Sequence, residues 1–354
     1  MENPLGQRLR ALPGPLMLTG HTGFKGTWMT SLLQYLKIPA VGFSLPAATS
    51  PLLDRSMWSG AIPEMLGDIR DYKALESFMD HFRPSTIIHM AAQPLVLESY
   101  KTPRETFETN VIGTVNLLDI AFKRDFVQAV VIVTTDKVYR NNNSGQSFVE
   151  TDPLDGKDPY SASKVGTEAA VRAWQQISKV SGGPKVVSVR AGNVIGGGDY
   201  SNDRIIPDLI RSAVTGKVVE IRNPSSVRPW QHVLDPITGY LMLIETMLNE
   251  IDISSLNFGP LHSEISVKEI TNIGIAMFPE LEKTLVFSPE STRGLEAMHL
   301  HVDSSNSMKI LGWTPRWSSH EAIQLTFDWW KAHLEEKTDP KLLCKLDIDR
   351  FFTN

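Results

Sequence analysis

A glycine-rich turn near the start of the chain constrains the fold more than any other feature. Residues 15–19 form a short apolar run, Gly20-x-x-Gly23-x-x-Gly26 follows at once, and residues 28–33 carry a helical pattern. Strand, glycine turn and helix in this order are typical of the first unit of a doubly wound sheet, because the glycines permit a tight turn and close backbone approach to a ligand. The exposed amides at the start of such a helix favour an anion, so the turn predicts a bound dinucleotide pyrophosphate.

The alternation of strand and helix continues through the first half of the chain. Helical periodicity covers residues 71–81 and 104–123, and further strands are predicted at residues 40–44, 86–90, 129–133 and 186–189. This order predicts an α/β fold with a Rossmann-type doubly wound parallel sheet, whose ligands bind at the carboxyl ends of the strands.

The composition changes near residue 194, where predicted loops rich in glycine, proline and arginine connect shorter helices. We expect a dinucleotide-binding domain over residues 1–193, with the chain returning to the sheet between residues 227 and 258. Residues 194–354 are expected to form a smaller, mainly substrate-binding α/β portion.

Composition excludes several classes of protein. The single cysteine, Cys344, rules out an internal disulfide framework and fits a reducing cytosol. No apolar stretch is long enough to span a membrane, and residues 1–4 lack the start of a secretory signal. A formal charge of −5 argues against a nucleic-acid surface, and no cluster of residues has metal-ligand spacing. We therefore expect a cytoplasmic protein without a metal, nucleic acid or membrane partner.

Tyr160 and Lys164 lie four residues apart in a predicted helix. Asp158 is a good N-cap and Pro159 a good first helical residue, so the phenol and the ammonium share one helix face. A neighbouring cation and an oxidised nicotinamide favour the phenolate, which can take a proton from a substrate hydroxyl while hydride leaves the same carbon. A lone Tyr-x-x-x-Lys pair is usually a surface feature, but the glycine turn upstream favours catalysis here.

Eight segments give the chain a resemblance to a known family. It resembles the extended short-chain dehydrogenase/reductases, among them the nucleotide-sugar 4,6-dehydratases, and most closely the CDP-glucose 4,6-dehydratases. The resemblance extends over residues 15–330 and is carried by Gly20–Gly26, Gly67–Arg70, His89–Val96, Thr109–Thr114, Thr135–Lys137, Tyr160–Lys164, Arg190–Asp199 and Val227–Val233.

This resemblance implies an NAD-dependent, redox-neutral dehydration of a hexose carried on a nucleoside diphosphate, with a 4-keto-6-deoxy sugar as product. Tyr160 would deprotonate the C4 hydroxyl and Thr135 would bind the C4 oxygen. Asp136 would be the acid for the C6 hydroxyl, and Lys137 would be the C5 base in place of the glutamate of dTDP-glucose dehydratases. The alternative for Asp136 and Lys137 is an ion pair ending a strand, which shifts both pKa values away from these roles.

The resemblance also implies a set of cofactor-binding residues. They are Gly20, Thr22, Gly23, Phe24, Gly26, Asp68, Ile69, Ala91, Ala92, Gln93, Asn110, Tyr160 and Lys164. The acid that usually binds the adenosine 2′-hydroxyl after the second strand is absent, and Ser44 stands in its place. NAD is expected, but NADP stays open because Arg55 could meet a 2′-phosphate. Lys25 is open between the pyrophosphate, the active site and solvent.

The substrate is expected to be a nucleoside-diphosphate hexose, with CDP-glucose favoured and the nucleobase undecided. The implied substrate-binding residues are Asn193, Arg204, Arg228, His232, Glu296 and His299. Arginine suits a diphosphate because its guanidinium binds two oxygens at once. Helices near residues 104–123 and 159–177 would pair across a two-fold axis as a four-helix homodimer interface, although core packing explains the same apolar pattern.

Two other functions remain open at this point. A related nucleotide-sugar epimerase or reductase would need Tyr160 and Lys164 but not an acid and a base at Asp136 and Lys137. A non-catalytic NAD(P)-sensing protein would need only the cofactor crevice.

Overall fold

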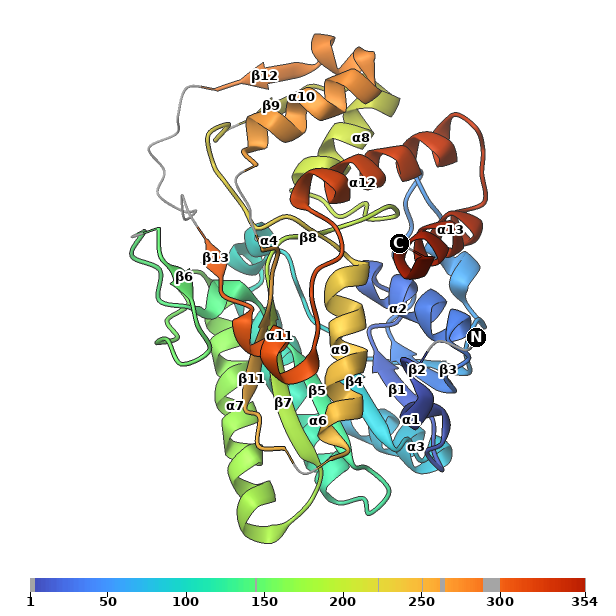
Figure 1. The fold of residues 1–354 in the computed structure, drawn as a ribbon, viewed down its shortest axis with the longest axis vertical. Helices are drawn as coiled ribbons and strands as arrows, with labels where there is room; N and C mark the ends of the chain where they lie inside the picture. Colours follow the sequence, from blue (N-terminus) through green and yellow to red (C-terminus); the bar gives the residue numbers. More distant parts are fainter. Residues whose placement is uncertain are drawn as a thin grey trace.

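The computed structural model describes residues 4–143, 145–221, 223–249, 251–261, 265–288 and 300–353. Its centre is a seven-stranded sheet in the order β11-β7-β5-β4-β1-β2-β3, and every pairing in it is parallel (Figure 1). The strands are β1 (Leu16–Thr19), β2 (Ala40–Ser44), β3 (Glu64–Leu66), β4 (Thr86–His89), β5 (Ala129–Val133), β7 (Lys185–Ala191) and β11 (Ser255–Phe258). The predicted doubly wound parallel sheet is confirmed.

Helices cover both faces of the sheet and make two hydrophobic cores. On one face lie α2 (Phe24–Tyr35) and α9 (Leu234–Met247), and on the other α3 (Tyr72–Phe82), α6 (Gly113–Phe122) and α7 (Pro159–Ser181). Successive residues of β5 alternate between the two cores, as Val131 and Val133 do against Val130 and Ile132. Because both faces are buried, these strands appear in the sequence as continuous apolar runs.

A π-helical turn interrupts the helix that the sequence predicts over residues 104–123. The segment consists of α5 (Pro103–Phe107), a π turn (Glu108–Ile112) and α6. Such turns are rare and frequently lie at functional sites. This one contains Asn110, which is 1% exposed and faces the loop after β4.

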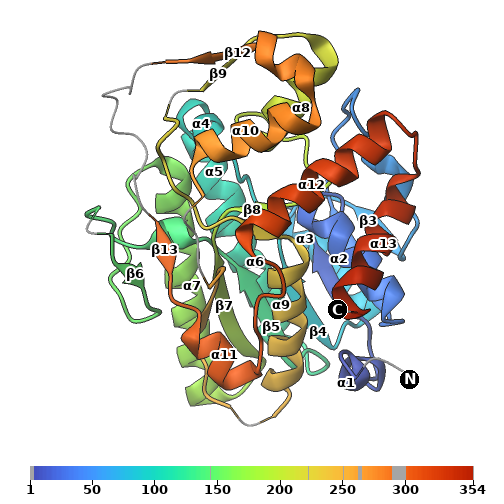
Figure 2. The same ribbon diagram turned by 45° about the horizontal axis from the view of Figure 1, so that its top comes forward.

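A group of elements from the second half of the chain lies beyond the carboxyl ends of the strands. Figures 1 and 2 show α8 (Ile205–Thr215), α10 (Val267–Met277) and the β9–β12 pair at this end, with α12 (Ser319–Leu334) beside them. Helix α13 (Pro340–Thr353) packs against α2. The division at residues 193 and 194 stays a prediction.

The remaining elements are short. They are α1 (Gln7–Arg10), α4 (Val96–Lys101), α11 (Ser305–Leu311), β6 (Ser147–Phe148), β8 (Val194–Ile195), β9 (Val219–Ile221), β10 (Gln231–His232), β12 (Leu285–Phe287), β13 (His301–Val302) and the 3-10 turns η1 (Arg55–Trp58), η3 (Asp136–Val138) and η4 (Pro279–Lys283). No helix in the described ranges combines the length and apolarity needed to cross a membrane.

A buried ion pair joins three elements beneath the ends of β5 and β7. Both nitrogens Nε and Nη2 of Arg190 donate to the carboxylate of Glu168 on α7, at 2.9 and 2.8 Å. The same carboxylate accepts from Thr134 at 2.6 Å and from Ser188 at 2.9 Å. The side chains of Arg190 and Glu168 are 4% and 2% exposed. Each buried charge is therefore stabilised by the opposite charge rather than by solvent.

We predict that Glu168→Gln lowers the free energy of unfolding by about 3 kcal/mol, because a buried guanidinium then lacks its counter-charge. Burial alone would raise the pKa of Glu168, but the hydrogen bonds and charge of Arg190 outweigh it and hold this pKa below its ordinary value. The stabilisation is therefore present above the unfolded-state pKa and is lost as the pH falls through the folded-state value. Urea denaturation as a function of pH measures both effects.

The matched control for this prediction is the exposed i,i+4 pair of Arg104 and Glu108. Arg104→Gln should change the free energy of unfolding by no more than about 0.5 kcal/mol. If the two substitutions changed the free energy of unfolding equally, the buried pair would contribute no more to stability than the exposed pair.

Candidate active site

The glycine turn between β1 and α2 has the shape that a pyrophosphate needs. Gly20 has φ +73°, and a Cβ there would lie 2.8 Å from the amide nitrogen of Ala91; a Cβ on Gly26 would overlap the Gly20 carbonyl oxygen. These two glycines make the turn possible. A Cβ on Gly23 would meet only the Gly20 oxygen, at 3.3 Å, and the N-terminus of α2 has no side-chain cap. A diphosphate binds in front of the backbone amides at the N-terminus of a helix. The N-terminus of α2 offers such a place, so this turn fits the predicted cofactor.

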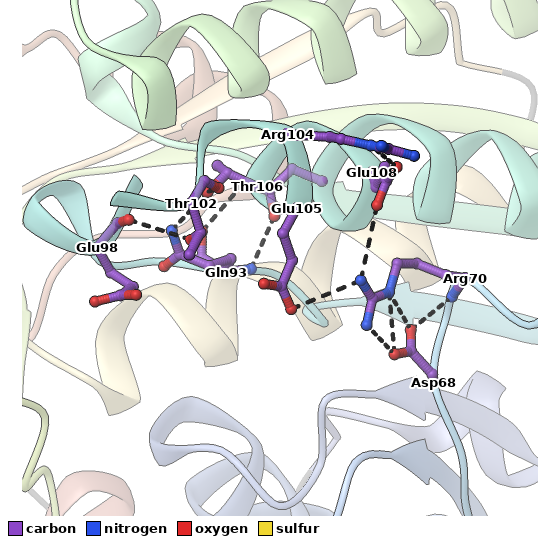
Figure 3. Close-up of polar contacts among 10 residues, drawn as sticks. Asp68, Arg70, Gln93, Glu98, Thr102, Arg104, Glu105, Thr106 and Glu108 are labelled. Carbon is purple, nitrogen blue, oxygen red and sulfur yellow. Dashed lines mark hydrogen bonds and ion pairs between the residues drawn. The ribbon is translucent and has the colours of Figure 1, made fainter. Parts of the chain in front are cut away.

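The loop after β3 is held rigidly at the side of the crevice where adenine is expected. The guanidinium of Arg70 binds Asp68, with Nη2 2.6 Å from the carboxylate, and also faces Glu105 and Glu108 at 3.6 and 4.0 Å (Figure 3). Hydrogen bonds from Arg70 lower the pKa of Asp68. Asp68 is therefore an ionised acceptor at a fixed position.

The end of β2 lacks the usual ribose-binding acid. The Thr22 hydroxyl hydrogen-bonds the Ser44 hydroxyl and the Leu45 carbonyl, both at 2.8 Å. Arg55 stacks on the Tyr200 ring, 3.8 Å from its centroid, and lines a cavity beside the turn. Glu64 lines the same cavity, and a negative carboxylate there opposes a 2′-phosphate. This arrangement favours NAD over NADP.

The side chains of two predicted cofactor residues, Gln93 and Asn110, hydrogen-bond to neighbouring parts of the protein. The Gln93 side chain donates to the Thr106 hydroxyl at 2.9 Å and accepts from the Leu95 amide at 2.6 Å (Figure 3). Asn110 accepts from the Gln93 amide at 2.8 Å and donates to Ser163 on α7 at 2.8 Å. Because their polar atoms already have partners, these side chains hold the loop after β4 in place rather than facing a ligand.

The predicted catalytic residues come together at the ends of β5 and the start of α7. Asp158 caps α7 in a capping box with Ser161, as the sequence indicates. The Thr135 hydroxyl donates to the Asp136 carboxylate at 3.1 Å and lies close enough to the Tyr160 phenol to lower its pKa. Lys164 donates to the Val133 carbonyl at 3.0 Å. Thr135 is therefore a neighbour of both Tyr160 and Asp136.

Asp136 has the properties of a proton donor. It is 1% exposed, and burial raises its pKa to about 6 against the opposing charge of Lys137. Its Oδ2 atom has no hydrogen-bond partner among the described residues, and these residues include no direct ion pair with Lys137. The geometry therefore favours an acid over the strand-ending ion pair.

The pKa of Tyr160 depends most on burial. Burial raises it to about 12, and the groups that oppose burial are the Thr135 hydroxyl and the Arg204 guanidinium. Burial also lowers the pKa of Lys164 to about 8. In the protein without nicotinamide, desolvation of Tyr160 therefore outweighs these groups and the phenol keeps its proton at neutral pH. The expectation that Lys164 and an oxidised nicotinamide together favour the phenolate stays a prediction.

The predicted substrate residues fall into three groups. Arg204, the N-cap residue of α8, forms an ion pair with the buried Asp199 at 2.7 Å, and its charge lowers the pKa of Tyr160. The charge of Arg228 lowers the pKa of Asp136. Both arginines therefore lie at the crevice. Asn193 follows β7 and its carbonyl accepts from Gln231. Glu296 and His299 lie outside the described residues.

His232 does not lie at the crevice. It is wholly buried, with its ring edge-to-face against Trp28 at 5.3 Å and Trp317 at 4.7 Å. Burial lowers its pKa to about 3, so the ring is neutral. The prediction of a nucleotide contact is wrong, because the apolar packing of two indoles encloses the imidazole.

No group of three or more histidine, cysteine, aspartate or glutamate side chains within the described ranges is placed to hold a metal ion. The crevice therefore offers a glycine turn for a dinucleotide, a Tyr-Lys pair and a buried carboxylic acid. These features define a nucleotide-dependent enzyme of Rossmann type.

Comparison with known proteins agrees with this class. The NAD dependent epimerase/dehydratase family matches residues 16–257, and the chain belongs to this family. It is 38% identical over 338 residues to CDP-glucose 4,6-dehydratase of Salmonella typhimurium, covering 93% of each chain. It is 27% identical to dTDP-glucose 4,6-dehydratase of Neisseria gonorrhoeae, covering 77% of this chain and 80% of the relative.

Solved structures share the fold. The dTDP-glucose 4,6-dehydratase of Streptomyces venezuelae, with NAD and TYD bound, has a TM-score of 0.78 at 23% identity, over 92% of this chain and 99% of that one. UDP-glucose 4-epimerase of Thermotoga maritima has a TM-score of 0.77 at 22% identity, over 91% of this chain and all of that one. The fold is therefore common to enzymes with different reactions.

We predict that Gly23→Val lowers the affinity for NAD at least about tenfold, or about 1.4 kcal/mol, while leaving the free energy of unfolding nearly unchanged. A Cβ at Gly23 lies 3.3 Å from the Gly20 carbonyl oxygen, a tight contact that a small shift relieves, and the methyl groups beyond it would occupy the space that the pyrophosphate needs. Calorimetric titration with NAD and thermal unfolding measure the two quantities. Gly26→Ala is the contrasting variant and should destabilise the fold, because its methyl group would overlap the backbone. If Gly23→Val bound NAD with normal affinity, the diphosphate would have to lie elsewhere.

Proposed function

We propose that the protein is an NAD-dependent hydro-lyase that converts CDP-glucose into CDP-4-keto-6-deoxyglucose. The observation that carries this is the buried Asp136 carboxyl, which accepts a hydrogen bond from Thr135, the neighbour of the Tyr160 phenol. An epimerase needs the Tyr-Lys pair, but it has no leaving hydroxyl to protonate. The 38% identity to a CDP-glucose 4,6-dehydratase over 93% of the chain supports the same reaction and nucleotide.

The residues of the crevice have complementary roles in this reaction. The nicotinamide supplies reversible hydride transfer, from C4 at the start and to C6 at the end. Tyr160 takes the proton of the C4 hydroxyl, while Thr135 holds the C4 oxygen. The C4 ketone acidifies the C5 hydrogen, so a base removes that proton as Asp136 protonates the departing C6 hydroxyl. Water leaves, and the cofactor is not consumed.

The arginines at the crevice suit the substrate's diphosphate. Arg228 is 9% exposed and Arg204 is half-buried, and both guanidinium groups are placed beside the catalytic residues. Asp199 neutralises part of the charge of Arg204 and fixes its orientation. Asn193 adds an amide donor from the turn after β7.

Incubation with CDP-glucose, and then with UDP-, GDP- and dTDP-glucose, tests the proposal. A 4-keto product that absorbs in alkali, with loss of one water by mass, supports the dehydratase. A C4-inverted sugar without water loss would support an epimerase. Cofactor binding without turnover of any sugar would support a sensor.

We predict that Tyr160→Phe lowers turnover by about 10²–10⁴-fold while NAD affinity stays within about threefold of the wild type. The phenyl ring fills the same space but cannot accept the C4 hydroxyl proton. Steady-state rates and calorimetric titration measure these values. Tyr100→Phe is the control, because Tyr100 lies on α4 with 46% of its surface exposed; near-normal turnover by Tyr160→Phe would remove the catalytic role.

We further propose a cytoplasmic homodimer formed through the helical segment over residues 104–123 and through α7. Helix α7 runs along one side of the molecule (Figure 1) and exposes Ala169, Ala173, Ile177 and Val180 along one face. Ile177 and Val180 are 44% and 75% exposed, so core packing does not account for them. The buried free thiol of Cys344 is consistent with a reducing compartment.

We predict that Ala173→Arg converts the dimer to a monomer, because a desolvated guanidinium without a partner would lie at the two-fold interface. Sedimentation at several protein concentrations measures the change. Val218→Arg, which alters an exposed residue next to β9, should leave the mass of the assembly unchanged. A wild-type protein that sediments as a monomer throughout would contradict the proposal.

A further inference from the structure

The turn that carries Asp136 is short and is weakly bonded by itself. It is the 3-10 turn η3, which lies between Thr135 and Tyr139. Its backbone hydrogen bonds, from Val138 to Thr135 and from Tyr139 to Asp136, measure 3.4 and 3.3 Å. Both are longer than the usual length of about 2.9–3.0 Å, as is common in 3-10 turns. The position of the Asp136 carboxyl therefore depends on how the two ends of the turn are anchored.

The first end of the turn is anchored by the sheet and by α7. The backbone amide of Thr134 donates to the Val189 carbonyl at 2.8 Å, and its hydroxyl donates to the Glu168 carboxylate at 2.6 Å. Thr135 follows directly in the chain. This end of the turn, with the Thr135 hydroxyl, therefore keeps its place independently of the residues beyond η3.

The second end of the turn is anchored by the phenol of Tyr139, a residue that is 2% exposed. The Tyr139 hydroxyl donates to Asn257 Oδ1 at 2.7 Å and accepts from Arg190 Nη1 at 2.9 Å. Asn257, on β11, donates in turn to the carbonyls of Phe148 and Asp303 at 3.0 and 3.1 Å. The Tyr139 ring stacks on Phe148, with 5.0 Å between the ring centroids and 4° between the planes. The phenol therefore joins the turn to β6, β7 and β11.

The backbone hydrogen bonds near this second end lead to the surface. The Val138 carbonyl accepts from the Asp155 amide, and the Arg140 amide donates to the Pro153 carbonyl, both at 2.8 Å. Pro153 and Asp155 are exposed. The hydrogen bonds of the Tyr139 phenol, in contrast, lead into the interior of the protein.

The segment of chain that binds the Tyr139 phenol also lies against the acid. Arg190, the donor to Tyr139, is two residues before Gly192. A Cβ on Gly192 would lie 3.2 Å from Asp136 Oδ2, the oxygen that has no hydrogen-bond partner among the described residues, and 2.6 Å from Pro229. The hydrogen bond between Tyr139 and Arg190 therefore sets where the free oxygen of the acid lies along this segment.

We propose that Tyr139 is a positioning residue: through Arg190 and Asn257 its phenol holds the turn so that Asp136 Oδ2 meets the C6 hydroxyl of the sugar. This inference rests on the proposed dehydratase function. As the C6–O bond breaks, the carboxyl proton of Asp136 moves to the departing oxygen, which leaves as water. Such a transfer needs a heavy-atom distance of about 2.6–3.2 Å, so a small displacement of the turn slows it. Tyr139 acts through the turn and not on the sugar.

The test is Tyr139→Phe, which keeps the ring and its stack on Phe148 and removes one oxygen. Two rates are measured in a single turnover of the nucleotide sugar that the wild type accepts: C4 oxidation from nicotinamide absorbance, and loss of water by mass spectrometry. We expect C4 oxidation within about threefold of the wild type and loss of water slower by about 10–100-fold. Reduced nicotinamide should therefore accumulate in the variant. A variant that is only less stable would lose both rates in proportion to its folded fraction, without this accumulation.

Two further variants complete the test. Tyr72→Phe makes the same chemical change on α3, where the phenol donates to Asp119 at 2.7 Å, and should leave both rates nearly unchanged. Gly192→Ala displaces the acid from the other side, because its Cβ would press on Asp136 Oδ2. It should slow the loss of water and lead to accumulation of reduced nicotinamide, and it tests the placement of the acid even if Tyr139→Phe does not fold.

Each other outcome overturns the assignment in a recognisable way. Normal loss of water in Tyr139→Phe, or equal slowing of both steps, would leave the phenol a purely structural role. Normal loss of water in Gly192→Ala would show that the placement of the acid against this segment does not limit the reaction. If the wild type forms no 4-keto product from any nucleotide sugar, the proposed function fails and this role fails with it.

Discussion

The pair of Glu168 and Arg190 is the interaction on which the arrangement of the site depends. Glu168 lies one helical turn after Lys164, and its carboxylate accepts from Thr134, the residue before Thr135 and Asp136. Since neither charge is tolerated alone in the interior, α7, β5 and β7 are held in one relative position. Only that position brings Tyr160 on α7 beside Thr135 and Asp136 after β5.

Burial is also what gives the crevice its acid–base character. It raises the pKa of Asp136 to about 6 and lowers the pKa values of Lys25 and Lys164 to about 7 and about 8. The pKa values of carboxyl and amine groups differ by several units in water. Here burial brings them close to neutrality, where proton transfer in both directions is efficient. The same burial raises the pKa of Tyr160 to about 12, so its deprotonation relies on positive charge around it, of which Arg204 is one source.

The fold does not decide the reaction, because dehydratases and epimerases share it with TM-scores of 0.78 and 0.77. The decision lies in a few side chains at the carboxyl ends of the strands. Here the buried Asp136 carboxyl follows β5, and Tyr160 and Lys164 approach it from the start of α7.

Local sequence patterns were enough for the doubly wound parallel sheet, the glycine turn and the N-cap of α7, because backbone propensity and periodicity act over a few residues. The family motifs likewise predicted Tyr160, Thr135 and Asp136. Tertiary structure alone decided that Gln93 and Asn110 hold a loop in place and that two indoles enclose His232. Hydrogen-bond partners and desolvation come from residues distant in the chain, so no local pattern contains them.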